Sequence, residues 1–430
     1  MPAPLRIRHL GNTDLDGRVL FAMRGADRDL LLANAPEAAG WTNALQWRRP
    51  IGDEPIVPLC LRTGTDAELR VGRAIAPALL TTLSDTEDRL GYVRWRTELL
   101  ACSEDTPEPM RGAGAVEPVA QAEPSEWIAR EIADLGPDHR LLDAGEYSVY
   151  LAEAPAIPRI LCEIGRLREI AFRAAGEGTG RRRDLDRFDD GYHHLFVWNA
   201  ERREIAGAYR LRLTDDNPAA LYTTTLFQLA PEFFGSLGPA IELGRSFIRV
   251  EYQKSFAPLL LLWKGIGRVV AAHPEHSTLF GPVSISNSYQ SISRELMMAF
   301  LEQHAMLADL ARWVRPKCAP KRRAGLNAGF CRDVETLSDV VADLEPERRG
   351  VPVLLRQYLR LGGKLLGFNV DHDFAAALDG LIVVDLTKTD PRLVERFFGK
   401  AEAAALRSHS PGCSLEHSKG NRENHEANHS

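Results

Sequence analysis

A strand, a helix and a second strand follow one another near the middle of the sequence, and this order constrains the fold more than any other feature. The first strand is predicted at Ile241–Val250 and carries Glu242 and Arg245. Pro258 then begins an apolar stretch, and proline is typical of the first turn of a helix. Leu279–Ser286 is a second apolar run that ends in small polar residues. Two strands joined by a helix predict neighbouring strands of an α/β fold.

The overall composition predicts a water-soluble chain of two or three domains. Its 430 residues are 44% hydrophobic, which is enough for real cores. The sequence has no apolar run near the roughly 20 residues that a membrane-spanning helix needs, and Met1 is not followed by a secretory signal. The six cysteines form no C-x-x-C pair, so we expect reduced packing thiols and no metal site. These features predict a cytoplasmic location.

The charge pattern bears on the class of partner. A net charge of −6 argues against a general nucleic-acid binder. Basic residues are nevertheless clustered at Arg181–Arg183 and between Arg312 and Arg323. Such runs are usually solvated faces, and the alternative is a landing surface for an acidic partner or for anionic lipid head groups. That alternative corresponds to peripheral contact with the inner membrane.

Composition also divides the chain into parts. A stretch rich in proline, glutamate, alanine and glycine separates two ordered units and is typical of a linker. The end of the chain is polar and holds four of the twelve histidines, which we interpret as a disordered terminus rather than a metal site. The expected parts are a first unit at 1–103, a linker at 104–137, a main domain at 138–405 and a tail at 406–430.

The main domain has an ordered series of elements with clear periodicity. Before the central strand we expect a strand at Tyr147–Glu153, a helix at Ile157–Ala175 and a hairpin of His194–Trp198 with Ile205–Leu213. After it come helices at Pro258–Ala272, Ser288–Ala305, Val334–Leu344 and Val351–Leu361, and strands at Leu279–Ser286, Lys364–Val370 and Leu381–Leu386. This order resembles the GNAT acyltransferase fold, a mixed α/β sheet flanked by helices. In that fold a splayed pair of parallel strands admits the pantetheine arm of a thioester donor.

This resemblance implies where the donor binds. The arm's amides would add to a strand edge, and its phosphate would sit at the start of the next helix. Coenzyme A users typically have a glycine-rich turn there, whereas Gln253–Ala257 contains no glycine. We therefore expect the acyl-phosphopantetheine of acyl carrier protein as donor, with acyl-CoA as the alternative and no permanently bound cofactor. The implied donor contacts are Ser246, Phe247, Ile248, Lys254 and Ser255.

Four motifs in order narrow the resemblance. They are R-x-x-x-F at Arg168–Phe172, D-x-x-D at Asp186–Asp189, G-x-x-R-L at Gly207–Leu211 and E-x-x-R at Glu242–Arg245. This set is similar to the GNAT branch that contains acyl-homoserine-lactone synthases and ornithine-lipid N-acyltransferases. The form E-L-G-R-S is closer to the ornithine side, often called hemolysin-like. The resemblance covers about Leu141 to Gly399.

The branch chemistry gives each motif residue an expected role. N-acylation needs an uncharged amine, a place for its proton and a stabilised oxyanion. Glu242 is the expected base or amine binder, and Arg245 would hold it or bind a substrate carboxylate. A purely structural Glu242–Arg245 pair is the alternative. The expected substrate contacts are Arg168, Asp186, Asp189, Arg210, Ser284 and Ser286, and Arg168 is also open to a carrier contact. For Asp186 and Asp189 the alternative is helix capping or salt bridges to Arg181–Arg183.

The implied function is an N-acyltransferase of aminolipid synthesis. It would move a fatty acyl group, expected to be 3-hydroxyacyl, from acyl carrier protein to the amine of an ornithine-like amino acid. A non-catalytic, membrane-active protein with the same fold is the alternative from another class.

The first unit resembles another acyltransferase. Pro55–Leu59, Leu69–Pro77 and Tyr92–Thr97 are similar to the closing third of a lysophospholipid acyltransferase domain. That family uses an H-x-x-x-x-D motif, and His9 and Asp14 have this spacing. We interpret the unit as a shortened, inactive remnant. A bifunctional O- and N-acyltransferase is the alternative.

Overall fold

The computed structural model describes residues 6–9, 20–24, 29–33, 55–62, 68–83, 85–102, 116–214, 220–323, 326 and 328–408. The chain forms two compact units, which are described separately. The first unit comprises Met1–Pro109, Asn287–His304 and Lys321–Arg356, and the second comprises Met110–Ser286, Ala305–Pro320 and Gln357–Ser430.

The first unit contains a five-stranded sheet in the order β1-β5-β4-β2-β3. Helix α2 packs on β4, and its Tyr92 and Trp95 meet the ring of Phe330. Arg96 of α2 pairs with Asp343 at 2.7 Å. The strands are β1 (Arg6–His9), β2 (Leu20–Arg24), β3 (Asp29–Ala33), β4 (Ile56–Arg62) and β5 (Glu68–Val71). The helices are α1 (Pro77–Thr81), α2 (Thr86–Cys102), α8 (Ser291–His304) and α10 (Val334–Leu344), while α11 (Val353–Arg360) begins here and ends in the second unit.

The helices predicted at Ser288–Ala305 and Val334–Leu344 are confirmed by α8 and α10. The motif of His9 and Asp14 is not tested, since Asp14 lies outside the described residues and only the backbone of His9 is described, in β1.

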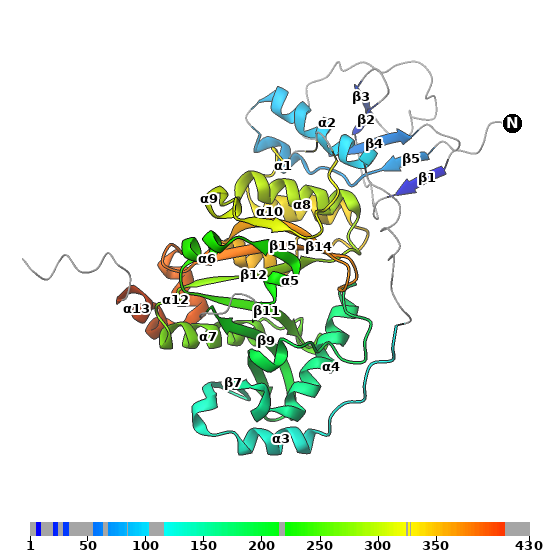
Figure 1. Ribbon diagram of the computed structural model, residues 1–430. Helices are drawn as coiled ribbons and strands as arrows, with labels where there is room; N and C mark the ends of the chain where they lie inside the picture. Colours follow the sequence, from blue (N-terminus) through cyan, green and yellow to red (C-terminus); the bar gives the residue numbers. More distant parts are fainter. Residues whose placement is uncertain are drawn as a thin grey trace, which may run out of the picture. The chain divides into compact units, whose positions relative to one another are not determined.

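The second unit is built on an eight-stranded sheet in the order β14-β15-β12-β11-β9-β8-β7-β6 (Figure 1). Strands β11 and β12 are parallel, and every other neighbouring pair in this sheet is antiparallel. This is the mixed sheet that the sequence predicts. Its strands are β6 (Arg140–Ala144), β7 (Tyr147–Glu153), β8 (His193–Asn199), β9 (Glu204–Leu213), β11 (Ala240–Ile248), β12 (Thr278–Ile285), β14 (Lys364–Asp371) and β15 (Ala377–Asp385). A separate two-stranded sheet joins β10 (Phe227–Leu229) and β13 (Val314–Pro316).

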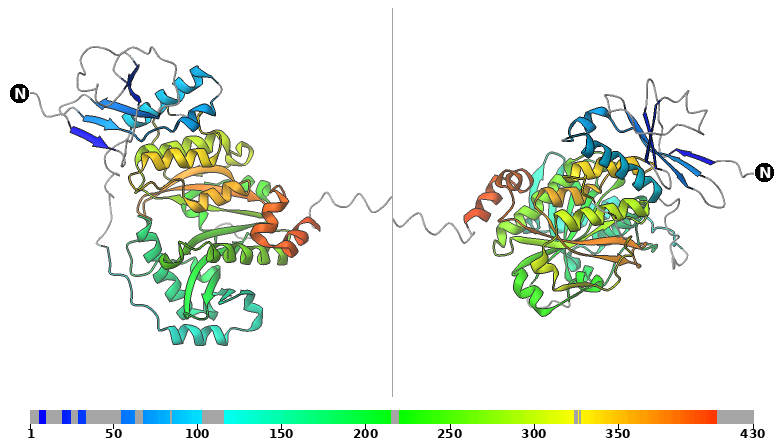
Figure 2. Two further views of the ribbon diagram at one scale, coloured as in Figure 1. Left: turned by 180° about the vertical axis from the view of Figure 1, so that it is seen from behind. Right: turned by 90° about the horizontal axis from the view of Figure 1, so that it is seen from above.

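Helices cover both faces of the large sheet. On one face α4 (Pro158–Ala174) buries Ile160 and Ile164 in a cluster with Phe196 of β8. On the other face α7 (Ala257–Ala272) packs so closely that a Cβ on Gly265 would meet Leu195. Residues 195 and 196 are consecutive in a strand, so their side chains lie on opposite faces. The remaining helices are α3 (Ser125–Asp134), α5 (Thr223–Leu226), α6 (Pro231–Leu237), α9 (Ala308–Ala311), α12 (Pro391–Phe398) and α13 (Lys400–Ser408), of which α12 and α13 pack beside α7 (Figure 2).

Part of the expected linker is ordered. Within residues 104–137 the structure has helix α3, which buries Ile128 and Ile132 in the α4 cluster. The Glu131 carboxylate accepts hydrogen bonds from the backbone N–H groups of Arg159 and Ile160 at 2.9–3.1 Å. It therefore satisfies donors of the first turn of α4 that have no partner within that helix.

None of the described helices is both long enough and apolar enough to cross a membrane.

Candidate active site

The central parallel strands part from one another partway along their length. Pairing of β11 with β12 joins Ala240–Glu242 to Thr278–Phe280, although both strands continue further. At the point of parting, a Cβ on Gly281 would lie 2.1 Å from the carbonyl oxygen of Leu243, so only glycine fits. Beyond this point the edge of β11 that faces β12 is open, as the donor prediction requires.

The open part of β11 contains a bulge. The register with β9 shifts between Gly244 and Phe247, and Arg245 has a φ of +48°. A non-glycine residue with positive φ is uncommon, and bulges often redirect a side chain beside an active site. Phe247 buries its ring in the α4 cluster, so only its backbone faces the open edge. The bulge turns Arg245 between the rings of Tyr222 and Phe374, each 4.8 Å from its guanidinium carbon.

Three arginines and three aspartates form one ion-pair network beside the bulge. Arg168 of α4 pairs with Asp189 at 2.8 Å, and Arg210 of β9 pairs with Asp186 at 2.7 Å and Asp189 at 3.2 Å. Arg245 pairs with Asp184 at 3.3 Å and lies 3.7 Å from Asp186. All four sequence motifs thus meet in space. Because each carboxylate has an arginine beside it, the cationic partner expected from the substrate for Asp186 and Asp189 is supplied by the protein.

The arginines of the network lower the pKa of Asp189. Burial alone would raise the pKa of Asp189, but Arg168 and Arg210 hold it well below its usual range. Burial, with Arg168, lowers the pKa of His194 to about 4, so the ring is neutral at pH 7. His194 contacts the backbone oxygen of Asp189 at 2.9 Å. We therefore assign these residues to holding the loop that follows α4.

Glu242 has different partners from those expected. Its Oε1 accepts from the backbone N–H of Thr223 at 2.6 Å and from the Thr223 hydroxyl at 2.5 Å. Its Oε2 accepts from the Tyr192 hydroxyl and from the backbone N–H of Tyr222. The expected contact with Arg245 is replaced by this set, because the bulge directs Arg245 towards Asp184 instead. Glu242 is 1% exposed and holds the start of α5 in place.

Ser284 of β12 and Ser286, which follows that strand, donate hydrogen bonds within the protein. Ser284 donates to Oε2 of Glu177 at 2.9 Å, and Ser286 donates to the backbone oxygen of Gly176 at 3.1 Å. These hydrogen bonds fix Gly176 and Glu177, which follow α4, against the sheet. The contact of both serines with substrate stays a prediction.

A second acidic group, which the sequence did not reveal, lies at this place. Asp379 of β15 is directly opposite Ser284 in the register, so both side chains point to one face. Burial raises the pKa of Glu177 to about 7, against the opposing effects of Ser284 and Arg245. Burial, followed by Asp371 and Glu177, raises the pKa of Asp379 well above its usual range. Burial also raises the pKa of Asp371. We call Glu177, Asp371 and Asp379 the acidic group.

The expected donor turn lies at the start of α7. Lys254 and Ser255 are exposed, and Ser255 accepts from the backbone N–H of Ala257 at 3.3 Å. Ser246 and Ile248 are half-buried on the open part of β11, and Gln253 donates from its side chain to the Ile248 carbonyl at 3.0 Å. The turn therefore connects the open strand edge to a helix start, the arrangement that a phosphopantetheine arm needs.

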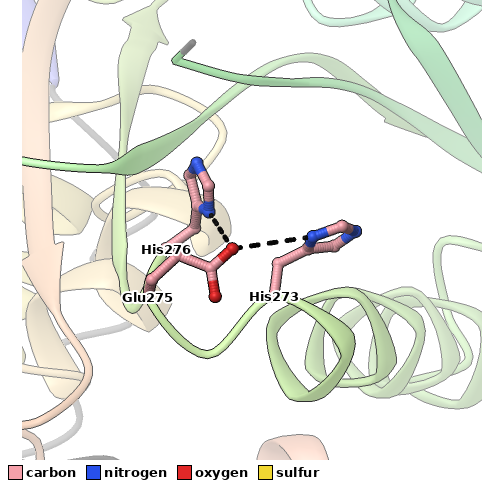
Figure 3. A group of neighbouring side chains, drawn as sticks. All are labelled: His273, Glu275 and His276. Atoms are coloured by element: carbon pink, nitrogen blue, oxygen red, sulfur yellow. Dashed lines mark hydrogen bonds and ion pairs between the residues drawn. The ribbon is translucent and has the colours of Figure 1, made fainter.

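One group in the second unit has the side chains to hold a metal ion. His273, Glu275 and His276, in the turn between α7 and β12, have ligand atoms within 4.8 Å of one another (Figure 3). Nδ1 of His276 lies 3.1 Å from Oε1 of Glu275, and Nδ1 of His273 lies 3.8 Å from it. The turn precedes β12, whereas Ser284 lies near the other end of that strand. The acyl-transfer steps described below use none of these three side chains.

Comparison with known proteins agrees with this geometry. Residues 167–264 match the acetyltransferase (GNAT) domain family. A glycine N(alpha)-acyltransferase of Bacteroides thetaiotaomicron is 32% identical over 293 residues, which cover 62% of this chain and 87% of that protein. A glycine N(alpha)-acyltransferase of Phocaeicola vulgatus is 32% identical over 272 residues, 57% of this chain and 83% of that protein.

The chain also has a likeness to the solved structure of FeeM, an N-acyl amino acid synthase from uncultured soil microbes. The match covers 36% of this chain and 77% of the FeeM chain, with 12% identity and a TM-score of 0.25. The two curated relatives are matched over most of their length. Because of this similarity and the matching GNAT domain, the chain belongs to the GNAT acyltransferase family and is an N-acyltransferase that acts on amino acids.

Proposed function

We propose that the protein transfers an acyl group from a phosphopantetheine thioester to the α-amine of a small amino acid, with glycine as the first candidate. The observation that carries this proposal is the opened β11–β12 pair beside two groups of buried charges. The open edge accommodates the donor arm, and the charged side chains surround the place where the acceptor would meet it. The names of the curated relatives support glycine.

The reaction needs few functional groups. The amine nitrogen attacks the thioester carbonyl carbon, a C–N bond forms, and the C–S bond breaks to release the pantetheine thiol. The ammonium form of the acceptor loses two protons in total, one to the leaving sulfur and one to a base. Backbone N–H groups on the open edge of β11 are suited to hold the developing oxyanion. Arg245 is the cation nearest to the acidic group and is proposed to orient the acceptor carboxylate.

For the donor we propose acyl carrier protein, with coenzyme A as the alternative. The turn Gln253–Ala257 contains no glycine. Pro258, in the first turn of α7, has no backbone N–H and so removes one donor from the helix start. A diphosphate needs more backbone donors than a single phosphate does. The exposed Lys254 offers a positive charge to an acidic carrier.

Ornithine is the second candidate acceptor, and the acidic group favours it. Glu177, Asp371 and Asp379 are three carboxyl groups, whereas glycine brings a single ammonium. An amino acid with a second ammonium would give a hydrogen-bonding partner to more of these carboxyl groups. Comparing glycine with ornithine as acceptor therefore tests whether the acidic group selects an amino acid with a second ammonium.

The test is a comparison of donors and acceptors. Purified protein is incubated with acyl carrier protein or coenzyme A thioesters of several chain lengths, and with glycine, ornithine, alanine or lysine. Products are separated and identified by mass spectrometry. We expect N-acylglycine and a higher kcat/KM with the carrier thioester. A preference for ornithine would select the second candidate, and thioester cleavage without an N-acyl product would reject both.

A further inference from the structure

We propose that the acidic group is the acceptor's ammonium site, with Asp371 and Asp379 binding the ammonium and Glu177 accepting its proton as general base. This inference rests on the proposed function and deepens it. It replaces the role that the sequence motif assigns to Glu242.

The acidic group lies beside the part of β12 that has separated from β11. Ser284, which holds Glu177, belongs to the part of β12 beyond the point where β11 and β12 part. Asp371 accepts from the Tyr222 hydroxyl at 3.2 Å, and the Tyr222 ring lies against Arg245 of the bulge. The loop after α4 and the β14–β15 hairpin, which are distant in the sequence, therefore bring carboxyl groups to one place beside the open strand edge, and β12 holds one of these groups through Ser284.

The acidic group has more carboxyl groups than cationic partners among the described residues. The arginines of the neighbouring network are matched one to one by Asp184, Asp186 and Asp189. Arg245 is the only cation that acts on all three carboxyls of the acidic group among the described residues, and it is already paired with Asp184. Asp379 is 5% exposed, and its Oδ2 has no hydrogen-bond partner among the described residues. A buried carboxyl oxygen without a partner is costly, and an incoming ammonium would satisfy it.

Glu177 is better placed than Glu242 to accept a proton. Glu242 is occupied by four donors from Tyr192, Tyr222 and Thr223, and protonating it would break part of that set. Glu177 receives a single side-chain hydrogen bond, from Ser284, and it is partly exposed. With a pKa of about 7 it exists in both protonation states near neutral pH, which suits a general base.

The proton transfer completes the reaction. The bound ammonium donates one proton to the Glu177 carboxylate, and the neutral amine attacks the thioester carbonyl. When the C–S bond breaks, the second proton passes from nitrogen to the leaving sulfur, which departs as the thiol. Glu177 then releases its proton to solvent, and the net products are an amide, a thiol and one proton.

The test is the pH dependence of kcat/KM for Glu177→Gln. In the native protein we expect kcat/KM to rise with pH through about 7, as Glu177 loses its proton. Arg245 and Asp379 are the charged groups that act on the Glu177 carboxyl, and Asp371 acts on Asp379; together they determine the pH at which kcat/KM rises. Glu177→Gln should lower kcat/KM by roughly 100-fold and remove the rise. Glu177→Asp should keep the rise at a reduced rate, and Glu201→Gln, on an exposed turn, is the matched control. A native rate and pH profile in Glu177→Gln would overturn the proposal.

Two further measurements separate failure of this site from failure of the proposed function. Glu242→Gln should retain the rise with pH, and loss of the rise there but not in Glu177→Gln would move the base to Glu242. Binding is measured without turnover, as the shift in melting temperature caused by glycine amide, a monocation. The shift should be present in the native protein and absent in Asp379→Asn. An equal shift in both proteins would reject the ammonium site even if N-acylation itself is observed, whereas a native protein that binds glycine amide but makes no N-acyl product would reject only the proposed function.

Discussion

Tyr222 links the two halves of the site, because its hydroxyl donates to Asp371 at 3.2 Å while its backbone N–H donates to Glu242 at 3.2 Å. The buried Glu242 of the motif is thus connected through one residue to the acidic group. We therefore expect a change at Glu242 to reach the acidic group through Tyr222.

Tyr222→Phe tests this link. It removes the hydrogen bond to Asp371 and keeps the ring beside Arg245, so we expect kcat/KM to fall several-fold with little change in melting temperature. Steady-state kinetics and a thermal melt check the prediction, with Tyr150→Phe in the α4 cluster as control. A large loss of stability and an unchanged rate would show that the hydroxyl serves folding alone.

Glu242→Gln should destabilise the protein. A glutamine presents an N–H₂ group where Glu242 accepts hydrogen bonds, so at least one donor among Tyr192, Tyr222 and Thr223 loses its acceptor. Leaving a buried polar group unsatisfied costs roughly 1–3 kcal/mol. Denaturant unfolding measures the change. A variant as stable as the native protein that has lost turnover entirely would instead favour direct participation of Glu242.

Asp379→Asn should stabilise the ligand-free protein at pH 7. The raised pKa of Asp379 means that the folded protein keeps a proton that the unfolded chain releases near pH 4. Stability is therefore lost as pH rises from about 4 towards the folded pKa, and asparagine removes that loss. Melting temperatures at pH 4.5 and pH 7.5 check the sign, with the exposed Asp138→Asn as control. A gain that is largest at the lower pH would contradict the prediction.

Lys254→Glu should weaken the use of a carrier-protein donor. Lys254 is exposed in the turn before α7, where an acidic carrier would approach the phosphate site. Reversing this charge should raise KM for the carrier thioester several-fold and leave kcat nearly unchanged, with a difference that shrinks at high salt. Lys400→Glu, exposed at the start of α13, is the control. Equal KM values for both variants would argue against a carrier surface at this turn.

The sequence predicted the parts of the fold that local patterns determine. Strand β7 is found at the predicted residues, and α7 begins within one residue of Pro258 because proline fixes the first turn. Helix α3 was missed because Ile128 and Ile132 are its only buried residues and the surrounding composition is that of a linker. Its stability comes from contacts with α4, which no local pattern contains.

The residues of the site were also predicted only in part. The motifs identified Arg168, Asp186, Asp189, Arg210 and Arg245, and the structure brings all of them together. Their pairing could not be predicted, since the bulge that turns Arg245 away from Glu242 depends on the register with β9. The acidic group was missed because Glu177 lies far in sequence from Asp371 and Asp379, and it meets them only through Ser284 and the pairing of β12 with β15.

The most direct test of the proposed activity measures both products of the reaction, the free carrier thiol and the N-acyl amino acid. Acyl carrier protein charged with a fatty acyl group is mixed with the protein and ¹⁵N-labelled glycine, and mass spectrometry counts the free carrier thiol and the N-acyl product together. We predict one ¹⁵N-acylglycine for each carrier thiol released. Release of thiol with free fatty acid and no labelled amide would contradict the account.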